Sequence, residues 1–530
     1  MCIRDSDLIH EILYATTSAP VRRAHHRRAA DLLTEQPEVV GRHAAAAGDD
    51  VRAARAFLLA GEQAMARFAT ADAEALLTRA LEEAERTGAG ELLCRALIAR
   101  GHARNIRGAY RAAVGDFRAG LATAREAGDR RQEARALREL GGHSLNALGA
   151  PARESASYLQ EGLRIALSLG DRATEADLLA RLAILQGNRL RFTEAVGLGR
   201  RAVVAGRAAR SDHALAVGLD GLKSAHAYLG EVAPLTEVID ELEPLLRRLG
   251  NLRLLAWTVF ESAIPAVAAA RWDEAERRMT EAVDLSHRGG LVGNDSWFLA
   301  HLGWLARLRG RFDLALVHGR AAAAQARLVP QAWFGPSADA LLAGTMLDCG
   351  DADGAAAVLR DALDDAGAEG AEAYRLRCLA PLAEATGDPD VLAEAERLLG
   401  GIEAPPGSAF LLGADAYLGV ARAWLHHGEP HRARAVLAPL LVAARRLEWI
   451  PVLATAGLVD AHAAAALADD GAATAAEQAR ALAEQHGMAT VLQARCNTRA
   501  TSRPKVAPAP TTERQEQDDG SGRGPAGRVP

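Results

Sequence analysis

The chain offers few residues whose type and spacing could do chemistry, and its lysines are the first to consider. A phosphate-binding P-loop needs the pattern G-x-x-x-x-G-K-[ST]. Only two lysines occur, Lys223 and Lys505, and they follow Leu222 and Pro504 rather than glycine. Neither can therefore be the lysine of that motif. We expect no nucleotide site of the Walker A type in this chain.

Three histidines, His426, His427 and His431, surround a Gly-Glu-Pro turn. His427 and His431 are four residues apart, which is a metal-ligand spacing only on one continuous helix. The glycine and the proline between them break such a helix, so we interpret all three side chains as solvated turn residues. No GxSxG, HExxH or paired-carboxylate motif stands out elsewhere. We expect no catalytic residue, no metal and no cofactor.

A basic cluster runs from Arg22 to Arg28 and includes His25 and His26. Side chains of this kind can contact phosphate groups. A solvated helix face, or a face that packs against another domain, explains the same pattern without a ligand, and we favour that explanation. The net charge of the chain is −6, which gives no electrostatic reason to expect nucleic-acid contact.

The elements that would position any site are repeated units. A small residue is followed twelve positions later by alanine, and this pair recurs about every 40 residues. The pairs are Gly61/Ala73, Gly101/Ala113, Ala183/Ala195, Ala263/Ala275, Gly303/Ala315, Ala343/Ala355, Ala421/Ala433 and Ala463/Ala475. Three wider gaps can each hold one degenerate unit, near Gly142, Gly221 and Ala383. Roughly eleven units of this length predict a solenoid.

Each pair indicates two antiparallel helices that approach closely where both carry a small side chain. Turn residues between them, such as Asp273, Gly310, Asp313, Gly350 and Asp351, predict the end of one helix and the cap of the next. Apolar residues recur around these turns at helical spacing, and no stretch alternates with period two. We therefore predict an all-α fold without a sheet.

With these residues, the chain resembles the tetratricopeptide (TPR) family, whose pattern has Gly or Ala at repeat position 8, Ala at 20 and a large residue at 24. Two units that follow it are Gly101/Ala113/Phe117 and Ala343/Ala355/Leu359. The resemblance covers residues 51–495 and implies a right-handed α-α superhelix of about eleven helix-turn-helix repeats. The units here are longer than the usual length of about 34 residues, so we expect longer helices.

Five of the seven tryptophans lie between Trp257 and Trp333. In the family's numbering, residues of the first helix at positions 2, 5, 9 and 12 face the concave groove. The residues at these positions in two adjacent units are Trp257, Phe260, Trp297, Trp304 and Arg307. The resemblance implies that they bind a protein, a peptide or a small-molecule inducer. Burial of the rings between units is the alternative, and it stays open.

Cysteine usage and hydropathy bear on the compartment. The five cysteines are scattered and form no CxxC pair, which is typical of a reduced, cytoplasmic protein. No run of 18 apolar residues is present, so we expect no membrane span.

The two ends differ from the repeats. Residues 7–14 read D-L-I-H-E-I-L-Y and precede the Arg/His-rich helix. This arrangement resembles the winged-helix end of the ATPase module in large LuxR-type and related AAA/STAND regulators. We interpret residues 1–50 as such a remnant, with 1–6 as a spurious lead, and expect a fragment that lacks the ATPase core. Residues 496–530 are rich in proline and glycine and predict a disordered tail.

Together, the resemblances imply a non-catalytic binding arm, either sensor or scaffold, of an ATP-dependent bacterial signalling or transcription regulator. Two alternatives stay open: the regulatory repeat region of an adenylate-cyclase-type enzyme, and a stand-alone TPR scaffold. The genomic sequence upstream of this chain would distinguish the three.

Overall fold

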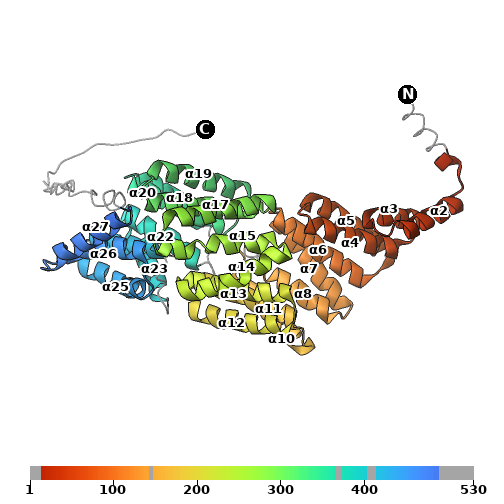
Figure 1. Ribbon diagram of the computed structural model, residues 1–530, viewed down its shortest axis with the longest axis horizontal. Coiled ribbons are helices and arrows are strands. Elements are labelled where there is room, and N and C mark those ends of the chain that lie inside the picture. Colours follow the sequence, from red (N-terminus) through yellow and green to blue (C-terminus); the bar gives the residue numbers. More distant parts are fainter. Residues whose placement is uncertain (1–12, 143–146, 366–371, 403–412, 489–530) are drawn as a thin grey trace, which may run out of the picture.

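The computed structural model describes residues 13–142, 147–365, 372–402 and 413–488. Within these ranges the chain forms 25 α-helices and one short 3₁₀ helix, and it has no strand. The predicted all-α class is therefore confirmed. The molecule is elongated: helices α2–α5 project from one end, and α25–α27 lie at the other (Figure 1).

Successive helices pair as antiparallel hairpins, and eleven such units follow α2 (Ala19–Leu32) and α3 (Pro37–Ala47). We call the first helix of each unit its A helix and the second its B helix. The units are α4/α5 (Asp50–Ala66, Thr70–Thr87), α6/α7 (Gly90–Ile106, Tyr110–Glu126), α8/α10 (Arg130–Leu140, Ala152–Leu169), α11/α12 (Arg172–Asn188, Phe192–Ala208), α13/α14 (Asp212–Leu229, Val232–Leu249), α15 with α16/α17 (Leu252–Glu261, Ile264–Ala268, Trp272–Arg288), α18/α19 (Asp295–Leu308, Phe312–Leu328), α20/α21 (Phe334–Asp348, Ala352–Asp365), α22/α23 (Glu372–Thr386, Pro389–Gly400), α24/α25 (Gly413–His426, Pro430–Arg446) and α26/α27 (Ile450–Ala466, Ala472–Gln485). The 3₁₀ helix η1 (Val292–Asn294) precedes α18.

The small residues of the repeat lie where the two helices of a unit touch. A Cβ atom added to Gly61 would lie 2.6 Å from the side chain of Leu77, and one added to Gly101 would collide with the ring of Phe117. The alanine at the second position is fully buried in the first units, at Ala73 for example. In the unit of Gly303, a Cβ atom on that glycine would lie 3.0 Å from the carbonyl oxygen of Ala315, so the close approach predicted from the twelve-residue spacing is confirmed there.

The turns follow the prediction in part. Gly310 and Gly350 have φ values of 71° and 85°, a region open to glycine and unfavourable for other residues. The carboxylate of Asp351 accepts a hydrogen bond from the backbone N–H three residues later, at 2.9 Å. Asp273 and Asp313 do not cap a helix, because each is the second residue of its helix, α17 or α19. At that position a carboxylate interacts favourably with the partial positive charge at the helix N-terminus.

Successive turns of the superhelix touch one another. The indole nitrogen of Trp449 donates to the carbonyl oxygen of Gly230 at 2.8 Å, and that of Trp272 donates to the carbonyl oxygen of His486 at 2.7 Å. The partners are 219 and 214 residues apart, which is about five units. A buried apolar cluster extends from Leu190 to Met488, so the centre of the solenoid is a packed core.

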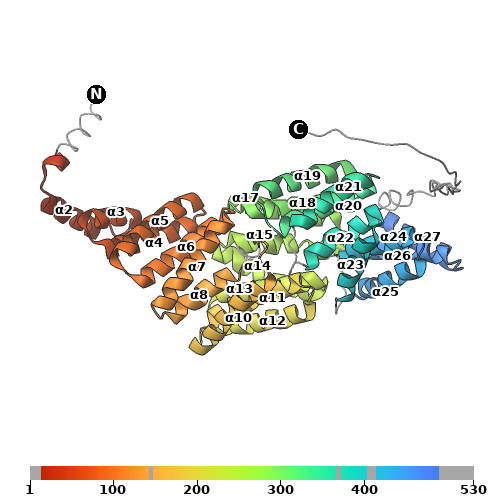
Figure 2. The same ribbon diagram turned by 180° about the vertical axis from the view of Figure 1, so that it is seen from behind.

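Two further contacts follow the same seam between turns. The phenol of Tyr374 donates to Asn188 Oδ1 at 3.1 Å, and Tyr228 donates to the same oxygen. The backbone N–H of Ala332 donates to the carbonyl of Ala147 at 2.9 Å. Accordingly α11 contacts α22, and α16 contacts α26. Figure 2 shows the later helices, α20 to α27, on the side of the molecule away from the N-terminal arm.

At the N-terminal end, α2 packs on α3, and α3 packs on α4. Gly41 of α3 lies against the ring of Phe57 so closely that a Cβ atom would be 2.7 Å from it. The assignment of residues 1–50 to an ATPase module stays a prediction. Residues 1–6 and 496–530 lie outside the described residues. Among the helices of the described ranges, none combines the length and the apolar character that crossing a membrane requires.

Candidate functional site

The structure brings the predicted aromatic residues together on adjacent A helices. Trp257 of α15 and Trp297 of α18 have ring centroids 6.1 Å apart, and Trp257 is also 6.1 Å from Phe260. The cluster includes two rings that the sequence did not single out: Phe298 lies 4.7 Å from Phe260, and Phe334 lies 5.0 Å from Trp297. The equivalent positions assigned from the repeat are therefore neighbours in space.

Most of these side chains are inside the molecule. The exposed fraction is 0% for Phe260, 3% for Trp297, 2% for Trp304 and 7% for Arg307, and Trp257 is half-buried. A helices of the following units pack against these rings: Phe334 of α20 lies 5.0 Å from the ring of Trp297, and the guanidinium of Arg377 on α22 lies over that ring at 5.4 Å. A partner cannot reach the four buried side chains in this conformation. Their role in partner binding stays a prediction, and packing between units describes their present contacts.

Arg307 connects three units. Its Nε donates to Asp348 of α20 at 2.6 Å, and its Nη1 donates to Asp415 of α24 at 3.1 Å. Burial would lower the pKa of Arg307, but the two carboxylates raise it above its ordinary value. A Cβ atom on Gly344 would lie 2.6 Å from Nη1, so the guanidinium occupies the space that this glycine leaves.

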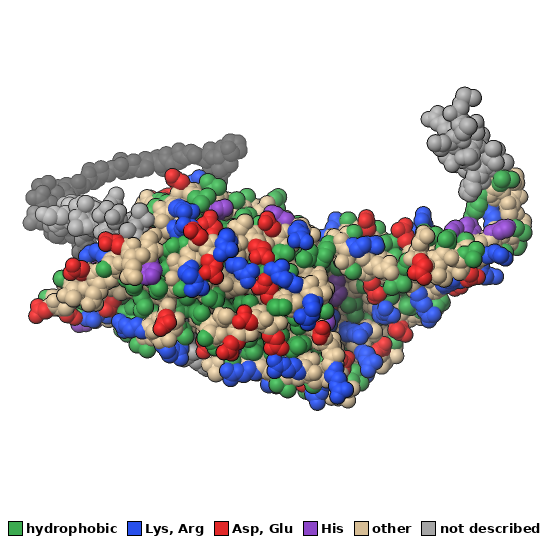
Figure 3. Space-filling model, viewed as in Figure 1, with side chains coloured by type: hydrophobic (Ala, Val, Ile, Leu, Met, Phe, Trp, Pro, Cys, Tyr) green, Lys and Arg blue, Asp and Glu red, His purple; other side chains and the backbone are tan. Residues whose placement is uncertain are grey.

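Charged side chains gather on the inner face nearer the N-terminus. Their members come from the A helices of the second, third, fourth and sixth units, α6, α8, α11 and α15, and we call this group the inner hollow: His102, Arg138, Glu139, Asp177, Arg181 and Arg253. His102 has a side-chain exposure of 38%, Arg181 of 23% and Arg138 of 21%, so solvent reaches them. The space-filling view is hollowed where the N-terminal helices meet the rest of the molecule, and a histidine lies at its wall (Figure 3).

Ion pairs connect most members of the inner hollow. Arg138 pairs with Glu139 and, at 3.0 Å, with Asp177, and Arg181 pairs with Asp177 at 2.7 Å. His102 Nε2 lies 3.4 Å from Glu139. Burial would raise the pKa of Glu139, but Arg138, His102 and Arg181 hold it well below its usual range. The acidic members are therefore charged and already matched by bases.

His102 responds to charges from several helices. Burial is the main cause that lowers its pKa from the usual 6.5. Glu139 opposes this effect, whereas Arg138, Arg181 and Arg253 add to it. His102 lies on α6 of the second unit and Arg253 on α15 of the sixth. Charges from α8, α11 and α15 therefore act on a histidine of α6.

Arg253 differs from the other basic members. Its side chain is exposed, and among the described residues it makes neither a hydrogen bond nor an ion pair. Although the side chain reaches solvent, the surrounding protein and then the charge of Arg181 lower its pKa, and Asp220, Asp177 and Glu139 oppose this effect.

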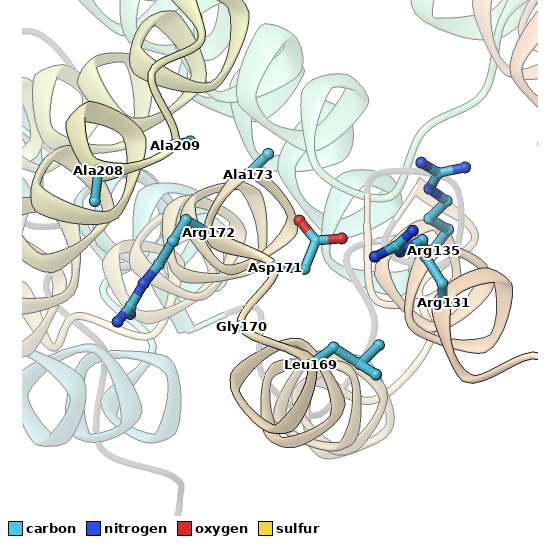
Figure 4. Close-up of a pocket in the computed structure, with 9 residues that line it drawn as sticks. All are labelled: Arg131, Arg135, Leu169, Gly170, Asp171, Arg172, Ala173, Ala208 and Ala209. Carbon is cyan, nitrogen blue, oxygen red and sulfur yellow. The ribbon is translucent and has the colours of Figure 1, made fainter.

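A shallow pocket of about 380 Å³ lies nearby, between the first turns of α8 and α11. Figure 4 shows the side chain of Arg131 directed toward Asp171, and that of Arg172 directed away from both. Asp171 accepts a hydrogen bond from the backbone N–H of Thr174 at 3.1 Å and so caps α11. The three arginines around this pocket, including Arg135, do not converge on one point.

The lysine and histidine residues that the sequence analysis considered first are in sites that explain them without a ligand. Lys223 is fully buried and pairs with Asp220 at 2.7 Å and with Glu261 at 2.9 Å. His427 and His431 lie on either side of the turn between α24 and α25. In the described part of the chain, no three or more His, Cys, Asp or Glu side chains are grouped in a way that could hold a metal ion.

The sequence contained a signal for the inner hollow that the aromatic residues overshadowed. With Ala113 at position 20, His102 occupies position 9 of its unit, the position of Trp304 in a later unit. Arg138 and Glu139 lie beside the degenerate unit near Gly142, whose register was not assigned, and Arg253 lies four residues before Trp257 in the unit of Ala263 and Ala275. Numbering every A helix by its repeat positions would have shown that these positions change from charged to aromatic residues along the inner face.

No protein-family model and no curated protein sequence matches this chain. Among solved structures, a Rap protein complexed with competence and sporulation factor aligns with 14% identity and a TM-score of 0.47, covering 74% of this chain and 98% of that one. A STAND protein with a tetratricopeptide repeat sensor from Pyrococcus horikoshii aligns with 11% identity and a TM-score of 0.39, covering 73% and 55%. Yeast Tom70 aligns with 14% identity and a TM-score of 0.35, covering 91% and 99%. Similarity this low transfers no ligand or partner, and the TPR-like architecture is evident from the helix pairs of this chain.

Proposed function

We propose that this chain is a binding scaffold that takes a polar ligand, a peptide or a small molecule, into the inner hollow. One observation carries the proposal: charged side chains gather from the four A helices α6, α8, α11 and α15, and His102, Arg138 and Arg181 among them are partly exposed to solvent. By contrast, Phe260, Trp297 and Trp304 lie in the buried apolar cluster. A solvated hollow walled by charges is a common form of ligand site.

In this proposal the five predicted residues act indirectly. Trp257, Phe260, Trp297 and Trp304 pack between units, and Arg307 holds the later units to α18. A ligand that contacted the four buried side chains directly would first have to separate the helices that pack around them. Their contribution is then to hold the wall of the solenoid in one shape.

The biological context proposed here is the sensor arm of an ATP-dependent signalling or transcription regulator. It is supported by the resemblance of residues 1–50 to the end of an ATPase module. Upstream coding sequence tests it: a P-loop would support this context, a cyclase domain would favour the enzyme alternative, and a start signal near Asp7 would favour a stand-alone scaffold.

The hollow itself is tested by blocking it. A panel of short peptides, amino acids and carboxylic acids is screened against the full chain by thermal shift. For any compound that raises the melting temperature, His102→Trp should abolish the shift, because the indole would occupy the hollow. His431→Trp is the matched control, since His431 is exposed in the first turn of α25. Retained binding in His102→Trp would contradict the proposed site.

A further inference from the structure

The loop between α19 and α20 connects the later units of the solenoid to the second and third units. A Cβ atom added to Gly108, in the turn after α6, would lie 2.6 Å from a methyl group of Val329. Three residues further along the loop, the backbone N–H of Ala332 donates to the carbonyl oxygen of Ala147 at 2.9 Å. We call this loop, residues 329–333, the strap.

The strap also contacts η1, and some of its polar atoms are unpaired. Gln331 Nε2 donates to the carbonyl oxygen of Gly293 at 2.7 Å, so the strap and η1 hold together. A Cβ atom on Gly293 would lie 2.6 Å from the hydroxyl oxygen of Tyr110 on α7. Within the described residues, Gln331 Oε1 and Asn294 Nδ2 are buried and have no hydrogen-bond partner. Each such atom costs about 1–3 kcal/mol, which weakens this contact.

The strap lies at the ends of two helices that carry residues of the inner hollow. His102 is in the last turn of α6, which ends at Ile106, and Gly108 follows directly. Glu139 is in the last turn of α8, which ends at Leu140. A helix rises about 1.5 Å per residue, so the contact at Gly108 is roughly 9 Å along the chain from His102. The strap therefore borders one mouth of the inner hollow.

The apolar packing on the two sides of the strap is largely separate. The buried clusters of the first three units contain residues 44–103 and 94–165, whereas the central cluster begins at Leu190. Ile106 of α6 is partly buried against the central cluster. Release of the strap would thus break a small set of contacts and leave each apolar core intact, which is the condition for local opening without global unfolding.

We propose that the strap is a releasable closure of the inner hollow. It detaches, together with η1, from the turn after α6 and from Ala147, and this widens the mouth beside His102. The inference rests on the proposed function where it names the hollow as the space that the strap closes. Release of the strap itself is measured without any ligand, so the two ideas can fail separately.

A disulfide tests the release. With Gly108→Cys and Val329→Cys together, a Cβ atom at position 108 lies 3.7 Å from Cβ of residue 329, a distance that a disulfide spans. In the reduced double variant, the amide of Ala332 should exchange with deuterium about tenfold or more faster than that of Ala343, a fully buried residue of α20. Oxidation should remove most of this difference. Equal exchange at Ala332 in the oxidised and reduced forms would overturn the proposal.

A second variant keeps the test independent of the disulfide and connects it to the hollow. His102→Cys places a thiol in the hollow, and mass spectrometry follows its reaction with fluorescein maleimide. Adding Val329→Asp, which sets a charge against Gly108, should raise the reaction rate about tenfold. Val317→Asp is the matched control on α19, because Val317 is 63% exposed, and it should leave the rate unchanged.

The outcomes separate the strap from the ligand site. An unchanged rate in the Val329→Asp variant would overturn the role of the strap as the closure of the hollow. The proposed function would survive that result if a ligand found in the thermal-shift screen still failed to bind His102→Trp.

Discussion

Single residues in this chain act mainly through burial and charge matching, and Arg307 shows both. Its partner Asp348 has no exposed side-chain surface. Removing one partner of a buried pair leaves an unmatched charge in the interior. We expect Arg307→Ala to lower the free energy of unfolding by about 3–5 kcal/mol in urea titrations. Arg248→Ala is the control, because its pair with Asp212 is 65% exposed on both sides, and it should cost less than about 1 kcal/mol.

The aromatic residues provide a second test at this scale. Trp297 and Trp304 are nearly fully buried, so truncation to alanine should create cavities and cost about 3–5 kcal/mol each. Val317→Ala, at a residue that is 63% exposed, should have almost no effect on the melting temperature. Tryptophan variants that melted like the unmodified chain and lost a bound ligand would restore the groove interpretation.

The protonation of His102 provides a third test at the scale of single residues. Because the folded-state pKa lies below the unfolded value of 6.5, the unfolded chain takes up the proton first as the pH falls. Stability is therefore lost on acidification through the region below pH 6.5. In urea titrations from neutral to mildly acidic pH, His102→Gln should show a smaller loss than the unmodified chain. An unchanged slope would show that His102 is not a source of the acid sensitivity.

At the scale of elements, the last unit is joined to the sixth and fifth by two tryptophans. Trp449→Phe would keep the aromatic packing and remove the hydrogen bond to Gly230, leaving a buried carbonyl without its donor. We expect amides of α26 and α27 to exchange faster with deuterium, with a loss of about 1–3 kcal/mol. Trp424→Phe is the control, because within the described residues the indole nitrogen of Trp424 has no hydrogen-bond partner.

At the scale of the whole molecule, ion pairs between B helices of neighbouring units repeat along the outer surface. Examples are Arg125–Glu161 at 2.9 Å, Arg207–Glu241 at 2.8 Å and Arg247–Glu281 at 2.7 Å. Acidic and basic side chains are interspersed over the face shown in Figure 3. Exposed pairs are weak singly and are screened by salt.

This series of ion pairs between neighbouring units predicts that the stability of the protein depends on ionic strength. Raising sodium chloride from about 0.05 M to about 1 M should lower the unfolding free energy by about 1–2 kcal/mol. The unfolding free energy of Arg247→Gln should fall less over the same change in salt, because this variant lacks the ion pair with Glu281. Stability that rose with salt in both proteins would show that burial of apolar surface outweighs these ion pairs.

The amino-acid sequence by itself determined the repeating unit. The spacing of small residues such as Gly61 and Ala73 records a contact between helices that are neighbours along the chain, and helical periodicity is local as well. Register also followed, since Trp257 and Trp297 occupy equivalent positions and lie side by side.

Only the tertiary structure decided which part of the inner face is open. Contacts such as Trp449 with Gly230 depend on the curvature that accumulates over about five units. No single repeat records this sum, because a small change in the angle between units displaces the next turn. The packing of neighbouring A helices likewise decided that Trp297 and Trp304 are buried, whereas His102 and Arg253 are reached by solvent.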